Sequence, residues 1–316
     1  MARVLVTRRL PDGGTDPLVE AGHEIVQRSG DTPYSRDELV SVVADVDAVV
    51  CLLTDRVDAG VLAAGAGGSL RVVANVAVGY DNIDVPEARR LGVAVCNTPG
   101  VLDETTADLA FLLVLSASRL SSAAEKDLRQ GAWGGWGVNQ YLGRDVHGAT
   151  LGLVGYGRIG QAVARRAGGF GMQVLHHTRR PTGSPGYVAE LDELLVRSDV
   201  VSLHVPLTDT TRHLISAREL ALMGPDAVLV NTARGPVVDE EALAEALQAG
   251  TIFAAGVDVF EREPAVHPRL LSAPRTVLLP HIGSASRATR VQMARVACQG
   301  ACDVLAGVVP ENLVKA

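Results

Sequence analysis

The chain has 316 residues, of which 47% are apolar and 21% charged, and its net charge is −7 at pH 7. This length exceeds what one hydrophobic core usually spans, so we expect two domains, each with its own core. The acidic balance argues against a general nucleic-acid binder. The sequence also lacks a run of about 18 apolar residues, so no membrane-spanning helix is expected.

The N-terminus and the cysteines indicate a cytoplasmic protein. The first three residues lead directly into a strand-like apolar run, so no segment has the apolar core of a signal peptide. We expect buried, reduced thiols, with neither zinc nor disulfides. The four cysteines lie in apolar surroundings without the paired spacing of a metal site; they are Cys51, Cys96, Cys298 and Cys302.

Residues 1–97 alternate short strand-like runs with helical stretches, which predicts a small parallel α/β unit. Loops 52–55 and 75–84 each follow a predicted strand, at the edge where open α/β sheets bind ligands. The second loop is small and contains Gly79, so its N–H groups could hold a carboxylate. An ordinary strand-to-helix turn is the alternative. The expected strands are Arg3–Thr7, Glu24–Gln27, Ala48–Leu53, Val72–Asn75 and Val93–Asn97.

After a Pro-Gly break the chain enters the apolar stretch Asp103–Leu120, which predicts a buried helix. This helix is a candidate connector between domains, with Thr106 near its cofactor-facing end. Residues 121–144 turn polar and glycine-rich and hold both tryptophans, Trp133 and Trp136. The two rings need a surface to bury against, either at a domain edge or on a partner subunit.

The second half is organised around a glycine pattern. The apolar run Leu151–Val154 leads into glycines at 155, 157 and 160, then a helix, then a strand at Met172–His176. In a dinucleotide site the first glycine makes the tight turn, the second admits a pyrophosphate and the third allows close helix packing. The helix N-terminus would face the phosphates. An ordinary βαβ turn is the alternative, which the order of the elements disfavours.

Strands and helices continue to alternate, which provides six parallel strands for a doubly wound domain over residues 99–287. A long helix over Ala285–Gly307 and the segment 310–313 then return to the first domain. That domain would be discontinuous, comprising residues 1–98 and 288–316. The further strands expected are 199–204, 227–231, 254–259 and 277–279, and the helices are 191–196, 216–223 and 240–248.

Taken together, these segments closely resemble the D-isomer-specific 2-hydroxyacid dehydrogenase family, and within it the glyoxylate/hydroxypyruvate reductases. The resemblance implies a Rossmann dinucleotide-binding domain, a smaller flavodoxin-like α/β substrate domain and a homodimer. It covers nearly the whole chain and rests on NVAVGYDNID (75–84), NTPGVLDETTADLAFLL (97–113), GLVGYGRIGQAVA (152–164), HVPLTDTTRHLI (204–215), NTARGPVVDEEAL (231–243), GVDVFEREP (256–264) and PHIGSASRATR (280–290).

The resemblance implies a catalytic trio of Arg234, Glu263 and His281. Reducing a 2-keto acid requires a proton donor for the carbonyl oxygen, and His281 follows a predicted strand. Glu263 would hold the other ring nitrogen and favour the imidazolium. Arg234 would supply a fixed cation for the substrate carboxylate and carbonyl oxygen.

The same resemblance implies the remaining binding residues. Leu53 would form a wall beside the substrate, and the backbone of Val78 and Gly79 would form a second cradle for its carboxylate. Asp258 would lie near the nicotinamide amide. The implied cofactor-binding residues are Thr106, Gly155, Gly157, Arg158, Ile159, Gly160, Thr178, Arg179, Arg180, Pro206, Thr211, Thr232, Ala233, Asp258, His281 and Gly283.

One departure from the NAD pattern concerns the cofactor. The second strand usually ends on an acidic residue that holds the ribose 2′-hydroxyl. Here Thr178 occupies that position and Arg179 and Arg180 follow. The change removes a negative charge and adds cations suited to a 2′-phosphate. It favours NADP(H) over NAD(H), with an exposed basic loop without a ligand as the alternative.

A second departure is Val138, where many relatives have proline two residues after the tryptophan of this loop. In related reductases the loop reaches across a dimer and helps to limit substrate size. We expect an NADPH-dependent reductase of glyoxylate, hydroxypyruvate or a similar small 2-keto acid. The alternatives are an NAD-linked or 2-ketogluconate-type D-2-hydroxyacid dehydrogenase and a nucleotide-sensing corepressor of the same fold. A phosphoglycerate dehydrogenase with a regulatory tail is disfavoured, because the chain stops soon after the closing helix.

Overall fold

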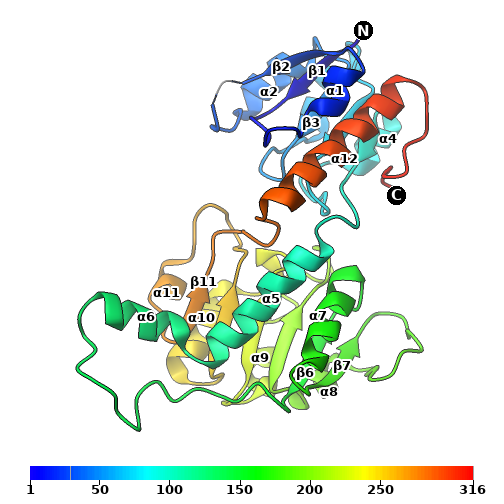
Figure 1. Cartoon of the computed structure of the whole chain (residues 1–316). Coiled ribbons are helices and arrows are strands. Elements are labelled where there is room, and N and C mark those ends of the chain that lie inside the picture. Colours follow the sequence, from blue (N-terminus) through cyan, green and yellow to red (C-terminus); the bar gives the residue numbers. More distant parts are fainter. Residues whose placement is uncertain (29, 316) are drawn as a thin grey trace. The chain divides into compact units, whose positions relative to one another are not determined.

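The computed structural model describes residues 1–28 and 30–315. The chain forms two compact units, one of Met1–Leu102 with Ser284–Ala316 and one of Asp103–Gly283 (Figure 1). Each is built on a parallel sheet with helices. Such sheets are covered on both faces, which explains why their strands are continuous apolar runs. The α/β class expected from the sequence is confirmed.

The first unit has a five-stranded sheet in the order β2-β1-β3-β4-β5. Chain order reverses between β1 and β3, and the crevice at such a switch point is where open sheets bind ligands. Loops 52–55 and 76–84 start at the carboxyl ends of β3 and β4, at this edge. The strands are β1 (Arg3–Val6), β2 (Glu24–Gln27), β3 (Ala48–Cys51), β4 (Val72–Asn75) and β5 (Ala94–Cys96).

Helices cover both faces of this first sheet. On one face α2 (Arg36–Val43), α3 (Ala59–Ala66) and α4 (Val85–Arg90) share an apolar cluster with alternate strand residues. The other face is covered by α1 (Asp16–Glu20) and α12 (Arg287–Leu305), which pack against each other. The C-terminal segment then returns to the sheet, since the N–H of Val314 donates to the carbonyl of Val95 at 2.8 Å.

The second unit has six parallel strands in the order β11-β10-β9-β8-β6-β7. Chain order reverses between β6 and β8, so the glycine turn after β6 lies at the switch point. One face carries α5 (Asp103–Ser118) and α7, and the other carries α8 to α11. The elements are β6 (Thr150–Val154), α7 (Arg158–Gly168), β7 (Gln173–His177), α8 (Leu191–Val196), β8 (Val200–Leu203), α9 (Ala217–Met223), β9 (Val228–Asn231), η1 (Gly235–Val237), α10 (Glu240–Ala249), β10 (Ala254–Val257), α11 (Pro268–Leu271) and β11 (Thr276–Leu278).

The apolar helix before β6 is shorter than predicted, and a second helix follows it. α5 ends at Ser118 (Asp103–Ser118), Leu120 takes a left-handed φ of 53°, and α6 continues over Ser121–Arg129. The sequence predicted only a polar segment there, because most residues of α6 are polar or charged, and none of them is buried. Among the described residues no single helix is long and apolar enough to cross a membrane. Only α5 and α6 taken together have that length and apolarity, and they are bent by 70° relative to each other.

The two tryptophan side chains of the loop after α6 are exposed to solvent. Trp133 is 48% and Trp136 83% exposed in the isolated chain. Of the two surfaces expected to bury the rings, a domain edge or a partner subunit, the chain's own described residues provide none. In contrast, all four cysteines are free and buried, as expected. Burial raises the pKa of the Cys302 thiol to about 11, which makes it unreactive at neutral pH.

Candidate functional site

The glycine turn joins β6 to α7 with little space around its first and third glycines. Gly155 has φ of 97°, and a Cβ there would lie 2.5 Å from the carbonyl oxygen of His204. A Cβ at Gly160 would lie 2.4 Å from the carbonyl oxygen of Gly155. Gly157 is the N-cap of α7 and supplies no capping side chain. The first N–H groups of α7 therefore remain available to an anion.

The loop after β7 is anchored at its base and exposed at its tip. His176 is fully buried; its ring stacks on Tyr156, with 3.9 Å between centroids, and its Nε2 lies 2.7 Å from the hydroxyl of Thr182. Thr178 follows β7 directly and donates to the carbonyl of Arg180 at 2.6 Å. The side chains of Arg179 and Arg180 are exposed. The two predicted phosphate-binding cations thus lie at the carboxyl end of β7.

Glu263 and His281 form a hydrogen-bonded pair. Oε2 of Glu263 lies 2.8 Å from Nδ1 of His281, and Oε1 accepts from the N–H of Phe260 at 2.9 Å. Burial would raise the pKa of Glu263, but the bonds from His281 and Phe260 and the charge of Arg234 outweigh it, so this pKa lies below its ordinary value. The ionised carboxylate of Glu263 therefore stabilises the fold above its ordinary pKa, and this contribution is lost as pH falls through the lowered pKa.

Asp258 holds the turn that carries His281. Its two carboxylate oxygens accept from the N–H groups of Ile282 and Gly283, both at 2.8 Å, and its carbonyl accepts from the N–H of His281, also at 2.8 Å. His281 has φ of 53°, so its backbone needs this support. Burial raises the pKa of Asp258 to about 6, although the two N–H donors oppose the shift. Asp258 thus fixes the direction in which the imidazole leaves the backbone.

Arg234 follows β9 and is the N-cap of η1. The buried amide of Asn231 braces this loop, because it accepts from the N–H of Ala233 and donates to the carbonyl of Arg234, both at 3.0 Å. A Cβ at Gly235 would lie 1.9 Å from the carbonyl carbon of Phe260, so the two loops are in direct backbone contact. The structure therefore brings Arg234, Glu263 and His281 together. Sequence reasoning missed Asn231, whose only signal is a polar side chain at a strand end.

Other predicted cofactor-binding residues lie around the same edge of the second sheet. A Cβ at Gly283 would lie 3.3 Å from Asp258 and 3.5 Å from Thr106, so these three are neighbours. Thr211 donates to the carbonyl of Pro206 at 2.7 Å. The hydroxyl of Thr232 is buried and has no hydrogen-bond partner within the described residues. A buried polar atom without a partner is a position that a ligand can satisfy.

The remaining predicted substrate-binding residues belong to the first unit. Leu53 lies in the turn after β3, and Val78 and Gly79 lie in the loop after β4. Both loops start at the carboxyl edge of that sheet, next to its switch point.

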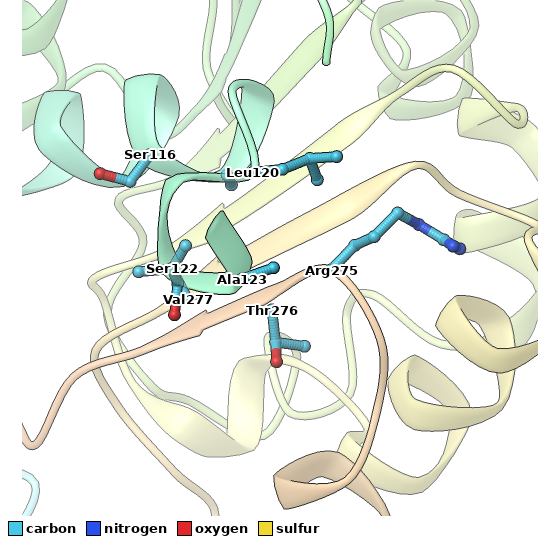
Figure 2. A pocket seen from close by; sticks show the side chains of 8 residues that line it. Ser116, Leu120, Ser122, Ala123, Arg275, Thr276 and Val277 are labelled. Atoms are coloured by element: carbon cyan, nitrogen blue, oxygen red, sulfur yellow. The ribbon is translucent and has the colours of Figure 1, made fainter. Parts of the chain in front are cut away.

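Two hollows in the second unit are lined by none of its predicted site residues. Figure 2 shows the smaller one, between the turn joining α5 to α6 and strand β11; its volume is about 10 Å³, enough for about one water molecule. The larger, about 320 Å³, is lined by residues such as Arg144, Asp199 and Asp226, before β6, β8 and β9. It therefore lies at the amino ends of the strands, opposite the glycine turn.

A doubly wound sheet with this glycine turn, together with a histidine–glutamate pair beside an arginine, defines a nicotinamide-dependent oxidoreductase. The family model for the D-isomer specific 2-hydroxyacid dehydrogenase, NAD binding domain, matches residues 111–283. The chain belongs to the D-isomer specific 2-hydroxyacid dehydrogenase family and is an NAD(P)-dependent oxidoreductase. The resemblance seen in the sequence is confirmed.

Relatives cover nearly the full length of the chain. A glyoxylate reductase of Thermococcus onnurineus is 47% identical over 321 residues, covering 99% of this chain and 95% of that protein. The structure of a Thermus thermophilus protein matches with a TM-score of 0.93 at 44% identity, covering 99% and 100% of the two chains. An NADPH-dependent glyoxylate/hydroxypyruvate reductase of Sinorhizobium meliloti, solved with NADP and malonate, matches with a TM-score of 0.86 at 36% identity, covering 99% and 96%.

Proposed function

We propose that this enzyme reduces glyoxylate, hydroxypyruvate or a similarly small 2-keto acid to the D-2-hydroxy acid and prefers NADPH to NADH. The observation that carries the proposal is the hydrogen-bonded pair of Glu263 and His281, 2.8 Å apart, with the charge of Arg234 acting on Glu263. Relatives named glyoxylate reductase support the choice of substrate class.

Each residue of the trio has a different role in the reaction. When bound, NADPH would supply a hydride for the carbonyl carbon of the substrate. The carbonyl oxygen then takes a proton from Nε2 of His281, the ring nitrogen that Glu263 does not hold. Glu263 orients the ring and stabilises its protonated form. Arg234 binds the substrate carboxylate and carbonyl oxygen through charge-assisted hydrogen bonds.

Several features of the second unit fit a nicotinamide dinucleotide. The uncapped N-terminus of α7 suits the pyrophosphate, and the buried hydroxyl of Thr232 would gain a partner from the ligand. Arg179 and Arg180 after β7 suit a ribose 2′-phosphate, which supports NADP(H). A ribose 2′-hydroxyl would find no carboxylate at Thr178.

The function is tested by steady-state turnover of glyoxylate, hydroxypyruvate, pyruvate and 2-ketogluconate with each cofactor. We expect the highest kcat/KM for glyoxylate or hydroxypyruvate with NADPH. Faster turnover of 2-ketogluconate would favour the sugar-acid alternative. If NADPH binds but no 2-keto acid is reduced, the chain is a nucleotide-sensing module.

Replacing Arg179 by alanine should raise KM for NADPH by about tenfold to hundredfold and leave KM for NADH nearly unchanged. Only NADPH carries the 2′-phosphate, and a charge-assisted hydrogen bond contributes about 1.5–3 kcal/mol. Initial rates with both cofactors measure the effect. Arg197→Ala is the control, since Arg197 pairs with Glu193 on the surface. Equal increases for both cofactors would contradict the NADP(H) assignment.

Replacing Glu263 by glutamine should move the alkaline limb of kcat/KM for reduction to lower pH. Reduction uses the protonated ring, and the neutral amide no longer stabilises that form, although it still accepts from the N–H of Phe260. Oxidation uses the neutral ring, so it should reach its plateau at lower pH. Each pH unit corresponds to about 1.4 kcal/mol. Both profiles are measured at saturating cofactor.

Glu261 provides the matched control for this variant, because it lies in the same loop but pairs with His213 at 2.9 Å. Glu261→Gln should leave both pH limbs in place. If the pH profiles of Glu263→Gln also show no shift of either limb, then Glu263 only positions the ring or His281 is not the titrating acid.

We also propose that the enzyme is a cytoplasmic homodimer. The loop after α6 exposes Trp133, Trp136, Val138 and Leu142, an apolar set that a partner subunit would cover. The cytoplasm keeps thiols reduced, which suits four free cysteines. Analytical ultracentrifugation of the native chain measures the oligomeric state, and a monomer at micromolar concentration would contradict the dimer.

A further inference from the structure

In residues 77–80 of the loop after β4 the carbonyls are hydrogen-bonded, whereas the N–H groups have no partner within the described residues. Four successive carbonyls, those of Ala77, Val78, Gly79 and Tyr80, all accept hydrogen bonds from the first unit. Over the residues that the structure describes, none of the N–H groups of these four residues donates a hydrogen bond. A run of unpaired N–H groups is a concavity that binds anions.

Two asparagine side chains hold the central carbonyls of this loop. Nδ2 of Asn97 donates to the carbonyl of Val78 at 2.7 Å, and Nδ2 of Asn75 donates to the carbonyl of Gly79 at 2.8 Å. Asn75 is fully buried at the end of β4, and Asn97 directly follows β5. Both amides therefore come from the carboxyl ends of neighbouring strands, which gives the loop a rigid base.

A third asparagine joins this loop to its neighbour. Nδ2 of Asn82 lies 3.3 Å from Oδ1 of Asn75 and also donates to the carbonyls of Leu52 and Asp55, at 3.2 and 3.0 Å. The loop that carries Leu53 and the loop that carries Gly79 are thus held in one arrangement.

Because the peptide bond is planar, each hydrogen-bonded carbonyl also fixes the direction of the N–H group in the same peptide plane. In a trans peptide the carbonyl of one residue and the N–H of the next point in opposite directions. Because Asn97 draws the carbonyl of Val78 inward, the N–H of Gly79 turns outward. Asn75 acts in the same way on the N–H of Tyr80. The backbone N–H of Thr98, which donates to the carbonyl of Ala77 at 2.9 Å, does the same for Val78.

We propose that Asn75 and Asn97 are positioning residues that orient the N–H groups of Gly79 and Tyr80 toward the substrate carboxylate. The inference rests on the proposed function and deepens it. It makes the carboxylate of the 2-keto acid the group that this loop recognises, and it extends the cradle from Val78 and Gly79 to Tyr80. Neither asparagine touches the substrate.

The test replaces each amide by leucine, which has a similar size and no donor. In Asn97→Leu and Asn75→Leu, KM for glyoxylate should rise about tenfold to hundredfold, the range set by losing one hydrogen bond to a charged group. The Kd for oxamate, an unreactive carboxylate analogue, should rise by the same factor in calorimetric titrations of the NADPH complex. KM for NADPH should stay within about twofold and kcat within about threefold, because the trio is intact.

Asn312→Leu is the matched control. Its buried amide donates to the carbonyls of Asn97 and Val296, at 2.8 and 3.1 Å, and touches neither substrate loop. This variant should lower Tm and leave KM for glyoxylate unchanged. If leucine prevents folding at either site, Asn75→Ser and Asn97→Ser replace these variants.

The inference is overturned if the asparagine variants lose stability like Asn312→Leu while KM for glyoxylate and Kd for oxamate stay at wild-type values. An equal rise of KM for NADPH would overturn it too, since the loop would then not be specific to the substrate. Failure of the proposed function looks different: the wild-type enzyme would neither reduce a 2-keto acid nor bind oxamate.

Discussion

Replacing His281 by asparagine is expected to lower kcat for glyoxylate reduction by about 10²–10⁴-fold, the usual contribution of a positioned general acid. Asparagine is the most suitable substitute, because His281 has φ of 53° and asparagine tolerates this left-handed conformation. The amide can still donate to Glu263 but cannot release a proton at working pH. Saturating steady-state rates measure kcat, and calorimetry should show an NADPH affinity within about twofold of wild type.

His213 supplies a control of the same geometry. It also has a left-handed backbone, with φ of 49°, and its Nε2 lies 2.9 Å from Oε1 of Glu261. His213→Asn therefore removes a histidine–glutamate pair from a strained backbone position without touching the trio, and its kcat should stay near wild type. If His281→Asn keeps kcat within about tenfold, another group must donate the proton. If both variants lose activity equally, His281 has only a structural role.

Replacing Arg8 by methionine is expected to lower the free energy of unfolding of the first unit by about 3–5 kcal/mol, the usual effect of breaking a buried ion pair. Arg8 and Asp55 form such a pair, with side chains 6% and 0% exposed. Asp55 also accepts from the hydroxyl of Thr7 at 2.6 Å and from the N–H of Leu52 at 2.8 Å. Without the guanidinium, a buried carboxylate would remain with only neutral donors.

The double variant Arg8→Met/Asp55→Asn is the control, because asparagine can still accept a hydrogen bond and carries no charge. It should recover much of the lost stability. Both tryptophans belong to the second unit, so hydrogen exchange of the β1 and β3 amides under increasing urea is the measurement that reports the first unit. A loss below about 1 kcal/mol, or no recovery in the double variant, would show that the buried charge does not govern the stability of this unit.

The strands and the glycine turn were predictable from sequence because their signals are local. A buried parallel strand is an apolar run, and the run before Gly155 is followed at once by the turn residues and helix. Helix α6 was missed for the complementary reason: its residues are mostly polar or charged and none is buried, so no apolar run marks it. The ends of the other helices and strands moved slightly, since a strand ends where hydrogen-bond pairing ends rather than where apolar residues end.

The trio could be named from sequence only through family resemblance, since nothing local links the three residues. Glu263 reaches His281 because β10 and β11 are neighbours and the loops after them meet at one edge. The contact of Gly235 with Phe260 also joins residues that are remote in the chain. Such contacts between residues remote in the chain cannot be derived from a single sequence.

The sequence by itself determined the α/β class, the two parallel sheets, the glycine turn and the buried thiols of this enzyme, because each follows from the apolar pattern or backbone freedom of adjacent residues. Only the tertiary structure decided which side chains hold the loops: Asn97 on Val78, Asn75 on Gly79, and Asp258 under the turn of His281. These hydrogen bonds depend on which strands lie side by side. The order of strands in a sheet results from packing the whole chain.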